Sequence, residues 1–129
     1  PDNYDWEGYT ILVVEDNYMS FKLLQALLRK SQVNILHADN GQGAIDMVNQ
    51  HPEIHLVIMD IQLPRMNGYE ATKEILKIRP GLPVIAQTAN AMDDDRLKCL
   101  NSGCCDYITK PIVFETFLEL INHYIRKPA

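Results

Sequence analysis

The chain has 129 residues, enough for one domain with a core of its own. Its formal net charge of −5 argues against bulk attraction to nucleic acid or to an anionic membrane. Its apolar runs are far too short to span a membrane, no signal peptide is visible, and three cysteines without a spaced framework fit a reducing cytoplasm.

Short apolar runs alternate with segments of helical periodicity along the chain. The apolar runs predict strands near residues 10–14, 33–38, 55–59, 83–87 and 105–108. The periodic segments predict helices near residues 17–30, 41–50, 66–79, 92–102 and 113–126. Turn signals such as Asn40-Gly41 and Pro80-Gly81 separate these elements, and Gly103 is placed to end the fourth helix.

Five strand–helix units in succession predict an α/β fold, a doubly wound five-stranded parallel sheet with five helices. The strand order 2-1-3-4-5, which is the flavodoxin-like arrangement, places the first and third strands side by side at the switch point. Residues 1–8, which include Trp6, are interpreted as a lead-in that packs on a domain over residues 9–126. Residues 127–129 are interpreted as a tail.

Charged residues come at or just beyond the ends of three of the predicted strands. Glu15 and Asp16 follow the first apolar run, Asp60 follows the third, and Lys110 follows the fifth. Because ligands bind at the carboxyl edge of the strands in open α/β sheets, these side chains are expected to meet at one site. Carboxylates that are crowded together repel each other unless a cation joins them. The pattern therefore predicts a hard divalent metal and an anionic substrate.

The metal that these residues suit is Mg²⁺, which takes oxygen ligands in octahedral geometry and usually binds through one or two carboxylates. Asp16 and Asp60 are the expected direct ligands. Glu15 would act directly or through water, and the backbone carbonyl of Gln62 would supply a further oxygen.

The same edge suits phosphoryl chemistry. Asp60 is placed as a nucleophile that takes a phosphoryl group to give an acyl phosphate. Lys110 would hold a phosphoryl oxygen as a point charge, and Thr88, at the end of the fourth strand, would donate a hydrogen bond to another. Each residue alone has an ordinary explanation as a helix cap, a solvated turn or a packed strand residue. Their joint occurrence at the strand ends carries the prediction.

At these positions the chain strongly resembles the receiver domain of two-component response regulators. The matching stretches are Ile11-Leu12-Val13-Val14-Glu15-Asp16-Asn17, Met59-Asp60-Ile61-Gln62-Leu63-Pro64-Arg65-Met66-Asn67-Gly68, Thr88-Ala89 and Asp106-Tyr107-Ile108-Thr109-Lys110-Pro111. The resemblance covers roughly residues 9–126 and is specific, because four motifs occur in order at the expected spacing.

The resemblance implies that Asp60 is the phosphoacceptor beside Mg²⁺, that Thr88 is the switch hydroxyl and that Lys110 is the phosphate-binding lysine. Tyr107 matches an aromatic switch position, whose side chain turns inward when the hydroxyl moves to the phosphoryl group. That movement would remodel the face made by the fourth helix, fifth strand and fifth helix. The resemblance also implies a cis bond between Lys110 and Pro111, and a role for Gln62 and Asn90 in tuning hydrolysis of the acyl phosphate.

Three stretches, Asp5–Gly8, Asn67–Thr72 and Thr88–Met92, look like receivers attached to hybrid histidine kinases. The phosphoryl donor would then be a phosphohistidine of a histidine kinase or a histidine phosphotransfer domain, in the same polypeptide or in a close partner. The domain would be cytoplasmic, with no contact to nucleic acid or membrane, although its parent kinase could be membrane-anchored. A phosphorylation-dependent dimer is left open. The domain itself would catalyse at most its own phosphorylation and dephosphorylation.

Other functions remain as alternatives. The chain could be a stand-alone single-domain response regulator, or a pseudo-receiver that binds partners without phosphorylation, although every expected site residue is present. A flavin-phosphate module would need a loop rich in Gly, Ser and Thr where Glu15 and Asp16 stand. A phosphate-ester hydrolase would need an acid two residues beyond Asp60, where Gln62 stands.

Overall fold

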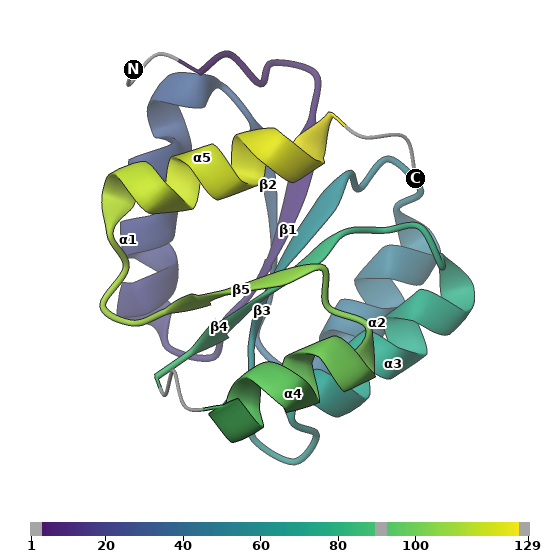
Figure 1. Cartoon of the computed structure of the whole chain (residues 1–129). Helices are drawn as coiled ribbons and strands as arrows, with labels where there is room; N and C mark the ends of the chain where they lie inside the picture. Colours follow the sequence, from purple (N-terminus) through teal and green to yellow (C-terminus); the bar gives the residue numbers. More distant parts are fainter. Residues whose placement is uncertain (1–3, 90–92, 127–129) are drawn as a thin grey trace.

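Five parallel strands form the centre of the structure, a computed structural model that describes residues 4–89 and 93–126 (Figure 1). The strands are β1 (Thr10–Val14), β2 (Asn34–Ala38), β3 (Leu56–Asp60), β4 (Val84–Thr88) and β5 (Asp106–Thr109). Their order in the sheet is β2-β1-β3-β4-β5, which confirms the predicted topology. The predicted tail at 127–129 and Asn90 lie outside the described residues.

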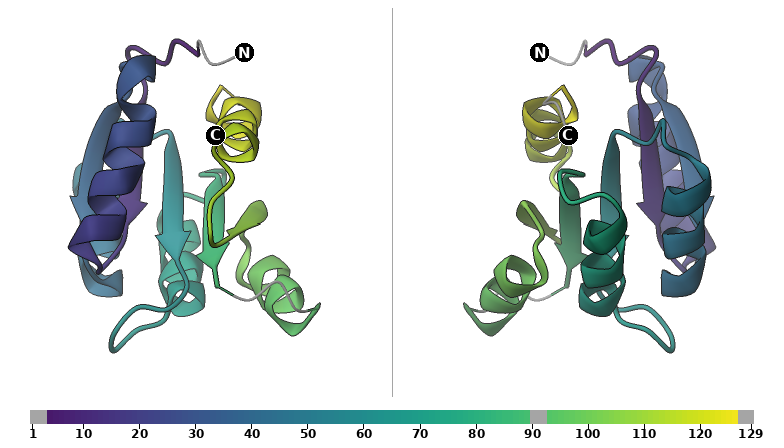
Figure 2. Two further views of the ribbon diagram at one scale, coloured as in Figure 1. Left: turned by 90° about the vertical axis from the view of Figure 1, so that its left-hand side faces the viewer. Right: turned by 90° about the vertical axis from the view of Figure 1, so that its right-hand side faces the viewer.

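Helices cover both faces of this sheet, as the two side views in Figure 2 show. They are α1 (Tyr18–Leu28), α2 (Gly41–Gln50), α3 (Gly68–Ile78), α4 (Asp93–Ser102) and α5 (Phe114–Ile125), with a short 3-10 helix, η1 (Arg29–Ser31), after α1. One buried core lies between the sheet and α1 with α5, and the other lies under α2, α3 and α4. No helix in the described ranges is long and apolar enough to cross a membrane.

Alternate residues of each strand face the two cores, as the pleat requires. Val13 and Ile58 pack on the side of α1 and α5, whereas Val14 and Met59 pack on the opposite side. Every residue of β1, β3 and β4 is buried. This burial explains why these strands read as almost continuous apolar runs in the sequence.

Asparagine side chains start three of the helices at the carboxyl edge of the sheet. The side-chain oxygens of Asn17, Asn40 and Asn67 accept hydrogen bonds from backbone N–H groups in the first turns of α1, α2 and α3. Such caps satisfy donors that a helix start leaves unpaired. They also set the boundaries, because α3 begins at Gly68, directly after its cap, rather than at residue 66 as predicted.

The lead-in packs against the domain through Trp6, whose side chain is fully buried in the core beside α5. Its indole N–H donates a hydrogen bond to the Asn122 side chain at 3.0 Å, and its backbone N–H donates to the carbonyl of Ser31. The start of the described chain is therefore tied to both α5 and η1. The division into lead-in, domain and tail stays a prediction.

Candidate functional site

Three carboxylates meet at the carboxyl edge of the sheet, where the sequence predicted them. Glu15 and Asp16 follow β1, Asp60 ends β3, and one carboxylate oxygen from each lies within 4.8 Å of the others. Glu15 and Asp60 are almost completely buried, whereas Asp16 is exposed. No other group of three such ligands occurs in the part of the chain that the structure describes.

The Lys110 ammonium lies over the two buried carboxylates. Its Nζ is 3.5 Å from Oε1 of Glu15 and 3.6 Å from Oδ2 of Asp60. Lys110 follows β5, two strands away from Asp60, and its backbone N–H donates to the carbonyl of Thr88. The Lys110–Pro111 peptide bond is cis, as the resemblance implied.

Glu15 is held in place by its neighbours on both sides. Its carboxylate accepts a hydrogen bond from the backbone N–H of Asn17, and its carbonyl oxygen lies 2.8 Å from Nε2 of His37. Burial and the nearby carboxylate of Asp60 raise the pKa of Glu15 to about 7. The Lys110 ammonium opposes this rise in pKa without cancelling it. The site therefore favours the uncharged form of the Glu15 carboxyl.

Asp60 sits on a tightly packed backbone. Its carboxylate accepts a hydrogen bond from the backbone N–H of Gln62 at 3.0 Å. Gly68, the first residue of α3, packs directly on the carbonyl oxygen of Asp60 and on the backbone of Ile61. The loop between β3 and α3 thus folds back on the end of its own strand, and it packs against the backbone that carries Asp60.

Thr88 and Tyr107 lie on neighbouring strands. Thr88 is the last residue of β4 and is almost completely buried. Tyr107 in β5 is half-buried and lines a pocket of about 440 Å³ together with Cys99 and Leu100 of α4. The structure therefore places Thr88 at the edge that carries the acidic site, and it places Tyr107 beside α4.

The donor set fits Mg²⁺. Three carboxylates carry more negative charge than one ammonium can neutralise, and oxygen ligands are those that this hard cation prefers. Glu15, Asp16 and Asp60 could each provide an oxygen to the same ion, since their oxygens are so close together. Gln62 lies in the adjoining loop, and the use of its carbonyl stays a prediction.

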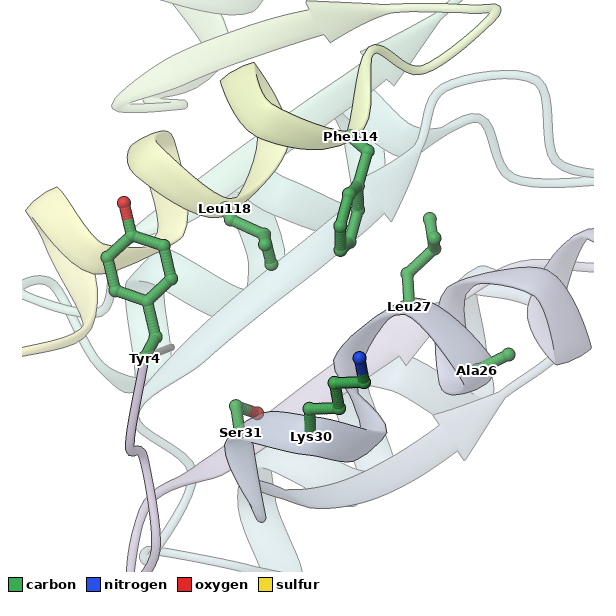
Figure 3. A pocket seen from close by; sticks show the side chains of 7 residues that line it. All are labelled: Tyr4, Ala26, Leu27, Lys30, Ser31, Phe114 and Leu118. Atoms are coloured by element: carbon green, nitrogen blue, oxygen red, sulfur yellow. The ribbon is translucent and has the colours of Figure 1, made fainter. Parts of the chain in front are cut away.

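A second cavity lies away from this chemistry. It has a volume of about 150 Å³ and separates α1 from α5. Figure 3 shows Leu27 of α1 pointing towards Phe114 and Leu118 of α5, with Tyr4 of the lead-in at one end. None of its lining residues belongs to the acidic cluster, so this cavity is not the reactive site.

Sequence reasoning missed two residues at the site. His37 stacks on Phe21, with ring centroids 3.8 Å apart, and supports the backbone of Glu15. Gln87 is buried beside Asp60 in the sheet, within the apolar run that predicted β4. Polar side chains near the carboxyl ends of predicted strands were the available signal for both residues.

The architecture and the acidic edge define a class, the receiver-type α/β domain, and comparison with known proteins gives the family. The family model of the response regulator receiver domain matches residues 11–122. The chain therefore belongs to the response regulator receiver domain family.

Two curated relatives illustrate the contexts in which similar chains occur. The chain is 40% identical over 125 residues to hybrid signal transduction histidine kinase I of Dictyostelium discoideum, and the match covers 91% of this chain but 7% of the kinase. It is 38% identical over 120 residues to the polar-differentiation response regulator DivK of Brucella anthropi, covering 90% of this chain and 95% of DivK.

Two solved structures with similar sequences share the fold. The receiver domain of the Saccharomyces cerevisiae response regulator Ssk1, crystallised with the histidine phosphotransfer protein Ypd1, is 31% identical, with a TM-score of 0.85 and 92% and 90% of the two chains covered. A sensor histidine kinase receiver domain from Pseudomonas aeruginosa is 32% identical, with the same TM-score and 93% and 99% covered. That receiver has a magnesium ion coordinated in its active-site cleft.

Proposed function

We propose that this domain accepts a phosphoryl group on Asp60 from a phosphohistidine in a two-component phosphorelay. The observation that carries the proposal is the position of the Lys110 ammonium, 3.6 Å from Asp60 within a cluster of three carboxylates. This combination offers a nucleophile, a metal site and a cation for the phosphoryl oxygens in one place. The phosphohistidine donor is supported by the Ssk1 receiver, which was crystallised with a histidine phosphotransfer protein.

In this proposal Glu15, Asp16, Asp60 and the carbonyl of Gln62 hold Mg²⁺. When bound, the ion offsets the negative charge that the carboxylates and the phosphoryl oxygens would otherwise bring together. The fit is supported by the close approach of the three carboxylates and by the magnesium ion in the related Pseudomonas receiver.

The reaction is a substitution at phosphorus. A carboxylate oxygen of Asp60 forms a bond to phosphorus while the P–N bond of the phosphohistidine breaks. The electron pair of that bond stays on the imidazole, which takes up a proton from solvent, and Asp60 becomes an acyl phosphate. Lys110 turns from the carboxylates to a phosphoryl oxygen, where its charge opposes the negative charge of the group.

The proposed switch passes from Thr88 to Tyr107. The Thr88 hydroxyl would donate a hydrogen bond to a phosphoryl oxygen. Tyr107 would then move towards the space that the Thr88 side chain vacates. Tyr107 lines the pocket between α4 and β5, so its movement would change the shape of this surface. The affected face consists of α4, β5 and α5, and a phosphorylation-dependent dimer through this face would be one output.

The surface beside the acidic edge suits a protein donor, since Leu23 of α1 lines one pocket with Glu15 and Lys110. Exposed apolar side chains gather on α1 and on the residues that follow β5; they are Tyr18, Met19, Leu23, Val113 and Phe114. Exposed apolar groups that gather beside a reactive group are typical of an interaction site. We therefore place the docking of the histidine donor on this apolar surface, hereafter the α1 surface.

The parent protein is proposed to be a cytoplasmic or membrane-anchored hybrid histidine kinase, on the motifs of the sequence and the Dictyostelium relative. A stand-alone response regulator is the second candidate, because DivK is matched over nearly its whole length.

The test is direct. The chain is incubated with a small phosphodonor and Mg²⁺, and its intact mass is compared with that of Asp60→Asn and of a metal-free control. A gain of one phosphoryl group that both controls lose is expected. If neither a phosphoryl group nor its mimic beryllofluoride is bound, the chain is a pseudo-receiver and the proposal is wrong.

A further inference from the structure

Gln87 carries an amide that is buried without partners. Its side chain is 1% exposed, and neither its oxygen nor its nitrogen makes a hydrogen bond within the described residues. Leaving a buried polar group unpaired destabilises the folded state, so native proteins keep few such groups. No other buried side-chain atom of the described residues has this deficit, which calls for an explanation in function.

The position of Gln87 is part of the reactive edge. Gln87 is the register partner of Asp60 across β3 and β4. The residues two positions before Glu15, Asp60, Gln87 and Lys110 all pack in the core on the side of α1 and α5; they are Val13, Ile58, Ile85 and Ile108. Because side chains alternate along a strand, the four polar residues project to that same side and form one row across the sheet.

A pocket joins three members of this row. It has a volume of about 260 Å³, and its polar lining consists of Glu15, Ser20, Gln87 and Lys110. Leucines of α1 and the residues after β5 form its apolar walls. Such a pocket has the room and the polar partners that an ordered water requires.

We propose that Gln87 is a positioning residue for phosphoryl transfer, which acts on Lys110 through water held in this pocket. The amide oxygen would accept a hydrogen bond from this water, which in turn accepts one from the Lys110 ammonium. The amide nitrogen would donate through water towards Glu15. This inference rests on the proposed function.

The geometry of Lys110 explains why such help is useful. Its two distances to carboxylate oxygens, 3.5 and 3.6 Å, are long for hydrogen bonds, while an ammonium has three N–H groups to place. A third partner on the pocket side fixes the ammonium where a phosphoryl oxygen arrives. An amide does this without adding charge to an already crowded acidic site.

A double-mutant cycle tests the coupling. The affinity for beryllofluoride, which stands in for the phosphoryl group, is measured by calorimetry at saturating Mg²⁺ for the wild type, Gln87→Met, Lys110→Met and the double variant. Gln87→Met is expected to weaken binding about 10-fold in the wild type and less than about 2-fold beside Lys110→Met, since coupled residues are not additive. Equal factors in both backgrounds, or no change, would overturn the proposal.

Stability separates positioning from a structural role. Gln87→Met removes an amide that makes no hydrogen bond to another described residue, so its melting temperature should equal or exceed that of the wild type. Gln50→Met, at an exposed glutamine in α2, is the matched control. It should change neither the affinity for beryllofluoride nor the melting temperature. A lower melting temperature shared by Gln87→Met and Gln87→Leu would make the role structural and overturn the inference. A wild type that does not bind beryllofluoride contradicts the proposed function itself.

Discussion

Gly68 packs so closely on the carbonyl oxygen of Asp60 that a methyl group at this position would overlap it. The two nearest atoms are backbone, so they cannot move aside as a flexible side chain would. The glycine that begins α3 is thus part of the support for the proposed phosphoacceptor.

Gly68→Ala is therefore expected to destabilise the fold by about 1–3 kcal/mol, as overpacking usually does, and to slow phosphorylation. Urea unfolding measures the first effect and intact mass the second. Gly43→Ala is the control, because its added methyl would meet nothing closer than the Asn40 cap at 3.3 Å. Equal stability of the two variants would refute the steric argument.

The buried charge of Glu15 should make the metal-free domain less stable as the pH rises. The folded chain holds the Glu15 proton up to a pKa of about 7, above the ordinary value of 4.5, so it binds more protons than the unfolded chain in this window. Stability should consequently fall between about pH 4.5 and 7. Thermal melting of the metal-free protein across this range, compared with Glu15→Gln, measures the effect.

Glu15→Gln should melt higher than the wild type at pH 8 without metal, by roughly 3–5 °C for each kcal/mol gained. Mg²⁺ should raise the melting temperature of the wild type and have less effect on Glu15→Gln or Asp16→Asn, which lose a carboxylate ligand. A wild-type melting curve that does not respond to millimolar Mg²⁺ would argue against the metal site.

The α1 surface should matter for protein donors alone. Met19→Glu is expected to slow transfer from a phosphorylated histidine phosphotransfer protein by about 10-fold or more, as loss of a central apolar contact does. Phosphorylation by a small donor should be unchanged, because Met19 is 75% exposed and does not line the pocket beside Lys110. Leu97→Glu on α4, at a leucine that is 57% exposed, is the matched control. Similar slowing by both variants would contradict the proposal that the histidine donor docks on the α1 surface.

The thiols at the start of β5 should be inert at neutral pH. Burial, with help from Asp106, raises the pKa of Cys105 to about 12, and burial also raises that of Cys104. A pKa that high leaves roughly a thousandfold less thiolate than an ordinary thiol has. Alkylation followed by mass spectrometry should be slow for the native protein at pH 8 and fast in urea, and Asp106→Asn should speed it at Cys105. Rapid native labelling of Cys105 would contradict this.

The sequence predicted the main features because they follow from local patterns. Apolar runs gave the strands, and residues directly after them had to meet at one edge, which is where Glu15, Asp16 and Asp60 lie together. The predicted end of α1 was less accurate. Helical periodicity continues to residue 30, whereas the α-helix ends at Leu28 and a 3-10 turn leads to Gln32 in the left-handed conformation.

Other features depend on contacts between distant segments and could not be read from a pattern. The support that His37 gives to Glu15 requires the ends of β1 and β2 to be adjacent and the ring to stack on Phe21. Gln87 looked like part of a buried strand, which it is, and its unpaired amide appears only when its surroundings are packed.

The buried indole of Trp6 gives the protein an optical reporter of its own. Trp6 is the sole tryptophan in the sequence, it stacks on Tyr4 with ring centroids 5.3 Å apart, and it is bonded to Asn122 of α5. Its fluorescence should therefore respond to changes in the packing of α5, without any added label. A change in the emission spectrum of Trp6 when beryllofluoride binds would show that binding at Asp60 alters the packing of α5 near Asn122. Trp6 itself lies outside the reactive edge.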